Sequence, residues 1–190
     1  FCVCSYILYT EIISLSTHYA QTCLQNFNFY VIIFLMNTYS LEKCMLCPVE
    51  CGTNRLVGVG ACGVSELRIA KYYLHPFEEP CISFQKGSGT IFFTGCNLRC
   101  VFCQNYEVSR AKRGKAITPN ELAAIFQELE EMGAENVSLV SPSHLIPYLV
   151  QAFEIYRPKI PVVYNTSSYE KVETIPLIAS SISSSLSTSP

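Results

Sequence analysis

Aspartate and tryptophan are both absent from the 190 residues of this chain. Acid–base chemistry must therefore come from Glu, His, Lys, Tyr or Cys, and a catalytic triad that contains aspartate is excluded. Charged residues are also scarce, at 15% of the chain, and the formal net charge is −2. A nearly neutral chain gives no reason to expect nucleic acid or an anionic membrane as a partner.

Both ends of the chain have almost no charge. Residues 1–40 carry one charged side chain, Glu11, and no residue after Glu173 is charged. The apolar run at 29–36 is too short to cross a bilayer, which takes about 20 apolar residues, and no basic segment precedes it as in a signal peptide. We expect residues 1–43 to be an atypical apolar segment without a membrane partner, and residues 175–190 to be a disordered Ser-rich tail.

Cysteine, by contrast, is abundant. The chain has eleven cysteines, an odd number whose spacings resemble metal sites more than a disulfide framework. This favours a reducing compartment, and we expect a cytoplasmic protein. The chain is 49% hydrophobic, which is enough to build the core of one ordinary domain.

One short stretch, GCNLRCVFCQN at 95–105, carries three cysteines in the spacing C-x3-C-x2-C. These are Cys96, Cys100 and Cys103, with Phe102 directly before the last. Three thiolates on one loop can hold three irons of a cubane [4Fe–4S] cluster. The fourth iron then has no protein ligand and can bind a small chelating molecule. The alternative is a zinc or disulfide loop, but zinc usually takes four ligands in pairs, which three cysteines fit poorly.

Residues 90–165 alternate between strand and helix patterns. We predict strands at 90–94, 137–141 and 161–165, separated by helices at 119–132 and 145–156. Thr118 and Glu121 have the spacing of a capping box at the start of the first helix. The order predicts an α/β fold with a parallel sheet and right-handed crossovers. The cysteine loop and the segments 141–144 and 165–168 should then meet at the carboxyl ends of three strands.

A resemblance to a known family covers residues from about 44 to 171. The chain resembles the radical S-adenosylmethionine (SAM) superfamily, in the branch of uncharacterised proteins related to pyruvate formate-lyase activating enzyme. It implies a partial (β/α)6 barrel, truncated here after about three β/α units, with its partial core at 87–174 and a cysteine-containing extension at 44–86. The stretches that carry it are CMLCP (44–48), HPFEEPCI (75–82), GSGTIFF (87–93), the cysteine loop through QNY (104–106), GAEN (133–136) and VYN (163–165).

The resemblance also implies a chemistry. Cys96, Cys100 and Cys103 would bind a [4Fe–4S] cluster whose open iron holds the amino and carboxylate groups of SAM. One electron from the reduced cluster would split SAM to methionine and a 5′-deoxyadenosyl radical that abstracts hydrogen, so the cofactors would supply the reactivity. Phe102 would lie near the adenine.

Two polar residues at the predicted strand ends, Ser141 and Asn165, are candidate SAM contacts. The alternatives are a packing role for Phe102 and a turn role for Asn165. His144 would be either a proton donor near SAM or a residue at the start of a helix with no catalytic role. No catalytic residue is assigned.

Several functions stay open. As a radical SAM enzyme, the protein would take hydrogen from a glycine of a partner protein or from a small molecule, with flavodoxin or ferredoxin as electron donor. The alternatives are an iron–sulfur electron carrier without SAM chemistry and a zinc-binding interaction module. Half a barrel would leave an open sheet edge, so we expect this chain alone to be insoluble or inactive.

A second set of cysteines precedes the predicted core. Cys44, Cys47, Cys51 and Cys62 have the spacing C-x2-C-x3-C-x10-C. Four thiolates at these spacings suit a closed zinc site or an auxiliary iron–sulfur cluster. The alternative is four reduced cysteines, some of them buried as small apolar residues.

Overall fold

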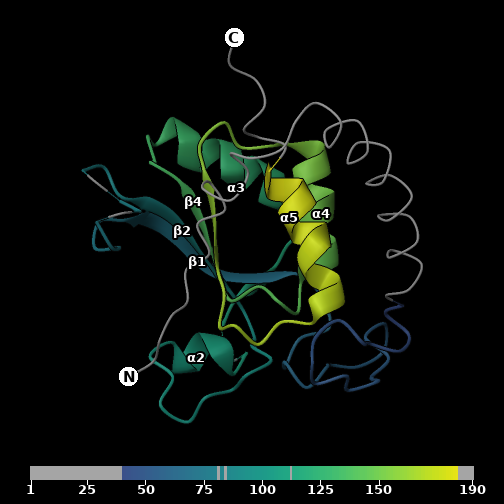
Figure 1. Cartoon of the computed structure of the whole chain (residues 1–190). Helices are drawn as coiled ribbons and strands as arrows, with labels where there is room; N and C mark the ends of the chain where they lie inside the picture. Colours follow the sequence, from purple (N-terminus) through teal and green to yellow (C-terminus); the bar gives the residue numbers. More distant parts are fainter. Residues whose placement is uncertain (1–39, 81, 84, 112, 184–190) are drawn as a thin grey trace.

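The fold is built on one sheet of five strands. A computed structural model describes residues 40–183 except 81, 84 and 112 (Figure 1). The strands follow the order β3-β1-β2-β4-β5 across the sheet. The elements are β1 Arg68–His75, β2 Ser88–Phe93, α2 Tyr106–Ser109, β3 Lys115–Ala116, α3 Pro119–Glu131, β4 Val137–Val140, α4 Ile146–Ile155, β5 Val162–Asn165, the 3₁₀ helix η1 Val172–Thr174 and α5 Ile175–Ser183. The sequence predictions for 1–39 and 184–190 lie outside the described residues.

Three of the strands are parallel. β2 pairs with β4 and β4 pairs with β5, both in parallel register. Each of these strands is followed by a helix, and Figure 1 shows α3, α4 and α5 together on one side of the sheet. Residues 88–183 therefore form three successive β/α units. The predicted α/β fold is confirmed, and the three units agree with a partial radical SAM barrel.

The main core lies between the sheet and the helices. Ile91 and Phe93 of β2 and Leu139 of β4 belong to the buried apolar cluster, and Ile91 pairs with Leu139 across the ladder. Residues two apart on a strand share a face, so these side chains all point toward the helices. There the rings of Phe126 from α3 and Phe153 from α4 stack with centroids 5.1 Å apart.

Helix α3 begins at the predicted capping box. The Glu121 N–H donates to Thr118 Oγ1 at 3.2 Å, and the Thr118 N–H donates to the Glu121 carboxylate at 2.7 Å. Pro119 occupies the first turn, where its missing N–H costs no hydrogen bond. These local signals explain why the helix starts where the sequence predicted.

Replacing Thr118 with alanine is expected to destabilise the protein. The substitution leaves an N–H at the helix start without its acceptor, and such losses lower the free energy of unfolding by about 1 kcal/mol. Chemical denaturation of the two proteins measures the difference. Thr118→Ser keeps the hydroxyl and is the matched control, so an equal loss in both variants would contradict a capping role.

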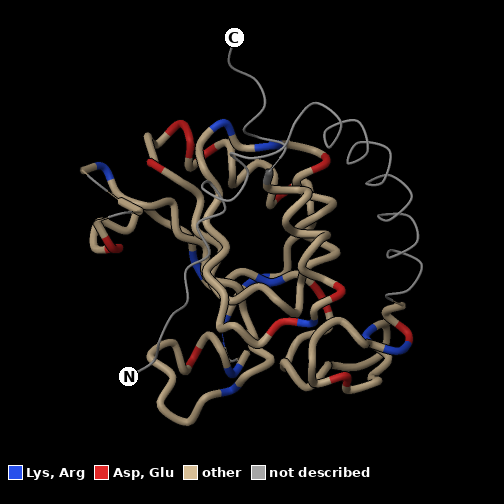
Figure 2. Tube along the Cα trace, in the orientation of Figure 1, with Lys and Arg blue, Asp and Glu red and all other residues tan. Residues whose placement is uncertain are grey.

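Two predicted domain boundaries are corrected by the structure. The segment 44–86 is not separate from the core, because β1 pairs with β2 in antiparallel register and belongs to the same sheet. Residues 175–183, which were expected to be part of a disordered tail, form α5 instead, with Leu177 and Ile178 buried. This helix has no charged residue (Figure 2). Its Ser-rich composition concealed an apolar pattern at helical spacing.

The cysteine-containing segment packs against the helices of the core. Leu46 is buried and forms a second apolar cluster with Cys44, Ile146, Val150 and Leu177. An ion pair between Lys171 and Glu50, 2.5 Å apart, adds a polar contact between the same two regions. The segment is therefore part of the same folded unit. No helix in the described part of the chain is long and apolar enough to cross a membrane.

Candidate metal and cofactor site

Loops from the three parallel strands meet at one end of the sheet. The cysteine loop follows β2, and Figure 1 shows α2, which ends this loop, at that end. The Ser141 N–H after β4 donates to the Asn165 carbonyl at the end of β5, at 2.8 Å. In the cysteine loop, the Asn97 amide donates to the Tyr169 carbonyl at 3.0 Å. These contacts confirm that the predicted segments converge, as the carboxyl ends of parallel strands must.

The start of the cysteine loop is fixed by backbone contacts. Gly95 has φ +86°, and its N–H donates to the Val108 carbonyl at 2.9 Å, which closes the loop at its base. A Cβ on Gly95 would lie 2.7 Å from the Cys62 carbonyl oxygen, so both the backbone angle and the close approach require glycine. The next residue, Cys96, donates its N–H to the same Cys62 carbonyl at 3.1 Å.

The three cysteines of this loop are free thiols. Cys96, Cys100 and Cys103 are each half-buried, so a ligand can reach them. Thiolates are the donors that iron–sulfur clusters use, and the donor set therefore fits such a group. Among the described residues, no three Cys, His, Asp or Glu side chains are already grouped as ligands of a metal ion. Ligation by these cysteines stays a prediction supported by their chemistry and their place in the fold.

Phe102 lies at an exposed part of the loop. Its side chain is 73% exposed, and the neighbouring Val101 is 86% exposed. A packing role for Phe102 beside a bound cluster, which is compatible with an adenine contact, is not tested by this exposure. An exposed aromatic ring beside the last cysteine is available to a bound molecule, and its contact with adenine stays a prediction.

Ser141 and Asn165 are neighbours at the strand ends. Ser141 has φ +48°, an uncommon conformation for a residue other than glycine, and its N–H bond to Asn165 holds the two loops together. Both residues are half-buried. The structure brings these two predicted contact residues to one place, and their contact with a cofactor is untested.

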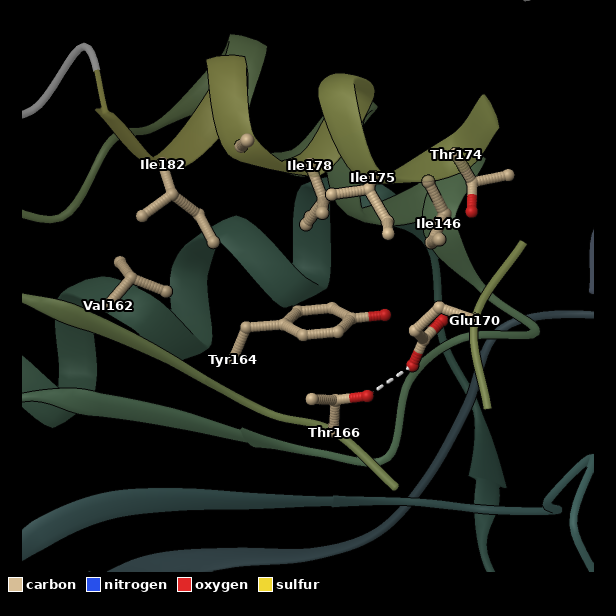
Figure 3. Close-up of a pocket in the computed structure, with 10 residues that line it drawn as sticks. Ile146, Val162, Tyr164, Thr166, Glu170, Thr174, Ile175, Ile178 and Ile182 are labelled. Carbon is tan, nitrogen blue, oxygen red and sulfur yellow. Dashed lines mark hydrogen bonds between the residues drawn. The ribbon is translucent and has the colours of Figure 1, made fainter. Parts of the chain in front are cut away.

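Glu170 is a polar residue at this end that sequence reasoning missed. Its carboxylate accepts hydrogen bonds from Ser143 Oγ at 2.5 Å and from Thr166 Oγ1 at 2.6 Å. The Ser143 hydroxyl is thus hydrogen-bonded to another group of the protein. Figure 3 shows the Tyr164 hydroxyl directed toward Glu170, and burial together with the Glu170 charge raises the pKa of Tyr164. The only signal for Glu170 in the sequence was its position after the third predicted strand.

A small apolar cavity lies between β5 and α5, beside Glu170 (Figure 3). Its volume is about 60 Å³, whereas sites for small molecules commonly enclose roughly 300–1,000 Å³. The cavity is therefore a packing gap and not a place for SAM. Its lining residues are Ile146, Val162, Tyr164, Thr166, Glu170, Thr174, Ile175, Ile178, Ala179 and Ile182.

His144 has a structural role. The side chain is fully buried, and its Nε2 lies 2.9 Å from the Thr94 carbonyl oxygen. Burial, helped by the nearby Arg55 guanidinium, lowers the pKa of His144 to about 4. The imidazole is neutral at pH 7, so Nε2–H donates to Thr94. This supports the alternative that His144 is not a proton donor to SAM.

The fold and the loop together define an α/β protein of successive β/α units with a three-cysteine loop after its first parallel strand. A family model of the radical SAM superfamily matches residues 90–189. The chain belongs to the radical SAM superfamily.

One relative extends the similarity upstream of the matched region. The chain is 32% identical over 146 residues to an uncharacterized protein of Methanocaldococcus jannaschii. The alignment covers 72% of this chain and 42% of that protein, so the chain spans less than half of the relative's length. No solved structure matches the chain.

Proposed function

We propose that this chain carries the cluster-binding part of a radical SAM enzyme. Cys96, Cys100 and Cys103 would hold a [4Fe–4S] cluster. When bound, the reduced cluster supplies the electron that cleaves SAM and gives a 5′-deoxyadenosyl radical for hydrogen abstraction. The observation that carries the proposal is the position of three free, half-buried thiols on the loop after the first parallel strand, inside the region that the family model matches.

The residues around the thiols would position the cofactors. Gly95 and the bond between Cys96 N–H and the Cys62 carbonyl fix where the loop starts. Phe102 offers an exposed aromatic face for the adenine. Ser141 and Asn165, held together at the neighbouring strand ends, offer polar groups to the rest of SAM. Orientation of this kind is the protein's part in chemistry that the cofactors perform.

The substrate belongs to the same proposal. The resemblance to relatives of pyruvate formate-lyase activating enzyme supports a glycine of a partner protein as the hydrogen donor, and a small molecule is the other candidate. The exposed loop, with Val101 and Phe102 at its surface, suits approach by another protein. Flavodoxin or ferredoxin would supply the electron. The seven described cysteines are all free, which supports a reducing, cytoplasmic location.

Electron paramagnetic resonance (EPR) of the anaerobically reconstituted and reduced chain, with and without SAM, tests the proposal. We expect a [4Fe–4S] signal that changes when SAM is added, because SAM would bind the open iron. The experiment measures cofactor binding and does not require turnover. It therefore suits a chain that spans 42% of the length of its relative. A signal that does not respond to SAM would favour an electron carrier. Zinc without iron after anaerobic purification would favour an interaction module.

A further inference from the structure

The four cysteines of the second set lie near one another in the structure, although no three of them are grouped as metal ligands. Cys44, Cys47 and Cys62 are buried, and Cys51 is half-buried. Cys44 lies near enough to Cys51 to affect it. A Cβ on Gly60 would lie 3.3 Å from Cys62 Sγ and 3.7 Å from Cys51 Sγ, so both sulfur atoms lie beside Gly60. Cys47 lies close enough to the other three for their charges to affect it.

The backbone holds the four thiols in this arrangement. Residues 44–53 fold back on themselves, because the Cys44 N–H donates to the Thr53 carbonyl and the Gly52 N–H donates to the Cys44 carbonyl, both at 3.0 Å. Gly52 has φ +63° in this turn. One of the sulfur atoms is also tied to the backbone beside it, because the Cys62 thiol donates to the Val64 carbonyl at 3.7 Å.

A buried cation faces the same cluster. Arg55 is 3% exposed, and its guanidinium donates to two backbone carbonyls, those of Ser65 at 3.1 Å and His144 at 2.9 Å. None of the ion pairs within the described part of the chain includes Arg55, and its Nη2 meets no acceptor there. Burial raises the pKa of the Cys62 thiol, and the charge of the nearby Arg55 opposes that shift. A buried charge without a counter-charge is costly, so this arginine requires an anion beside it.

We propose that Cys44, Cys47, Cys51 and Cys62 form a closed site for one divalent ion of the zinc type, with Arg55 as its counter-cation. Four thiolates around a divalent ion carry net negative charge, which matches the unpaired guanidinium. Sulfur atoms around tetrahedral zinc stand about 3.8 Å apart, given bonds of about 2.3 Å. Because no three described thiols are yet grouped as ligands, the loop closes on the ion when it binds.

The site would be structural, and it would support the cluster loop. Four protein ligands leave no open position for substrate. The carbonyl of Cys62 accepts the N–H of Cys96, so fixing Cys62 also fixes the first residue of the three-cysteine loop. This second metal site goes beyond the proposed radical SAM function and does not depend on it.

Metal content and cobalt spectroscopy test the site. The full chain is prepared with Cys96, Cys100 and Cys103 replaced by serine, so that the cluster loop cannot bind metal. We expect about one zinc per chain, and Co²⁺ should displace it with the absorption bands of a tetrahedral tetrathiolate complex. A further Cys47→Ser or Cys62→Ser change should weaken Co²⁺ binding at least tenfold.

Substitution of Arg55 is a second test of the metal site, separate from substitution of the ligands. Arg55→Gln removes the counter-charge and should weaken zinc binding about 10- to 100-fold, as loss of groups around metal ligands commonly does, while Arg55→Lys keeps the charge and should lose less. The proposal is overturned if the chain with the upstream set intact binds neither zinc nor cobalt, or if it retains iron and sulfide in their place. The cobalt spectrum of that chain decides the matter even where a ligand variant fails to fold.

Discussion

Replacing Cys100 with serine is expected to abolish the SAM-responsive cluster signal. Serine keeps the size of the side chain but removes a thiolate, and two remaining cysteines are too few to hold a cubane cluster on this loop. Iron content of the reconstituted protein should fall from about four atoms per chain to nearly none. Iron and sulfide analysis measures the loss directly, and EPR with and without SAM measures its consequence.

Val101→Ser is the matched control for this experiment. The residue lies next to Cys100 on the same loop and is 86% exposed, so the substitution changes the loop without removing a thiol or a packed side chain. We expect the iron content and the response to SAM to stay as in the unsubstituted chain. Retention of the SAM-responsive signal in Cys100→Ser would show that the assigned ligand set is wrong. Equal loss in both variants would point to a general sensitivity of the loop.

Elements with local signals were predictable from the sequence. The capping box at Thr118 and Glu121 marked the start of α3, and the β-rich runs marked β2, β4 and β5 close to their observed bounds. The alternation of strand and helix then implied parallel pairing. Since the carboxyl ends of parallel strands share one edge, the placement of the loops after β2, β4 and β5 at one end of the sheet followed from topology without any tertiary detail.

Elements that depend on distant contacts were not predictable in the same way. β1 is a strand because it pairs with β2, and that pairing is antiparallel and lies outside the β/α pattern. Serines fill the end of α5 and the segment after it, so composition predicted disorder for the whole of 175–190. Burial of Leu177 and Ile178 against other elements overrides that composition. Tertiary packing determines the secondary structure of such segments, whereas local propensity determines where α3 begins.

The relation between the two cysteine sets also required the structure. From its spacing in the sequence, the set Cys44, Cys47, Cys51 and Cys62 was distinguishable from the cluster loop, and metal binding was predicted for each set. Spacing gave no sign that the Cys62 carbonyl accepts the Cys96 N–H. Arg55 and His144, which join the same two regions, are 89 positions apart in the chain, so no local pattern connects them.

The buried His144 is expected to make the protein less stable in mild acid. Its folded-state pKa is about 4, below the ordinary value of 6.5, because burial disfavours the charged imidazole. Between these two pH values the unfolded chain binds a proton that the folded protein does not. Stability is therefore complete above pH 6.5 and falls as the pH drops toward 4. The free energy of unfolding should decrease by about 3 kcal/mol over this window, from about 1.4 kcal/mol per pH unit.

Urea denaturation at a series of pH values, for the unsubstituted chain and for His144→Gln, measures this effect. Glutamine does not titrate and keeps an N–H donor for the Thr94 carbonyl, so it should flatten the dependence between pH 6.5 and 4 even if it lowers stability overall. Glutamates also titrate toward pH 4, and they are common to both proteins, so the difference between the two curves isolates His144. Identical slopes would contradict a neutral, buried histidine. A smaller slope in the variant would show that the imidazole of His144 is uncharged in the folded protein and must gain a proton as the protein unfolds in acid.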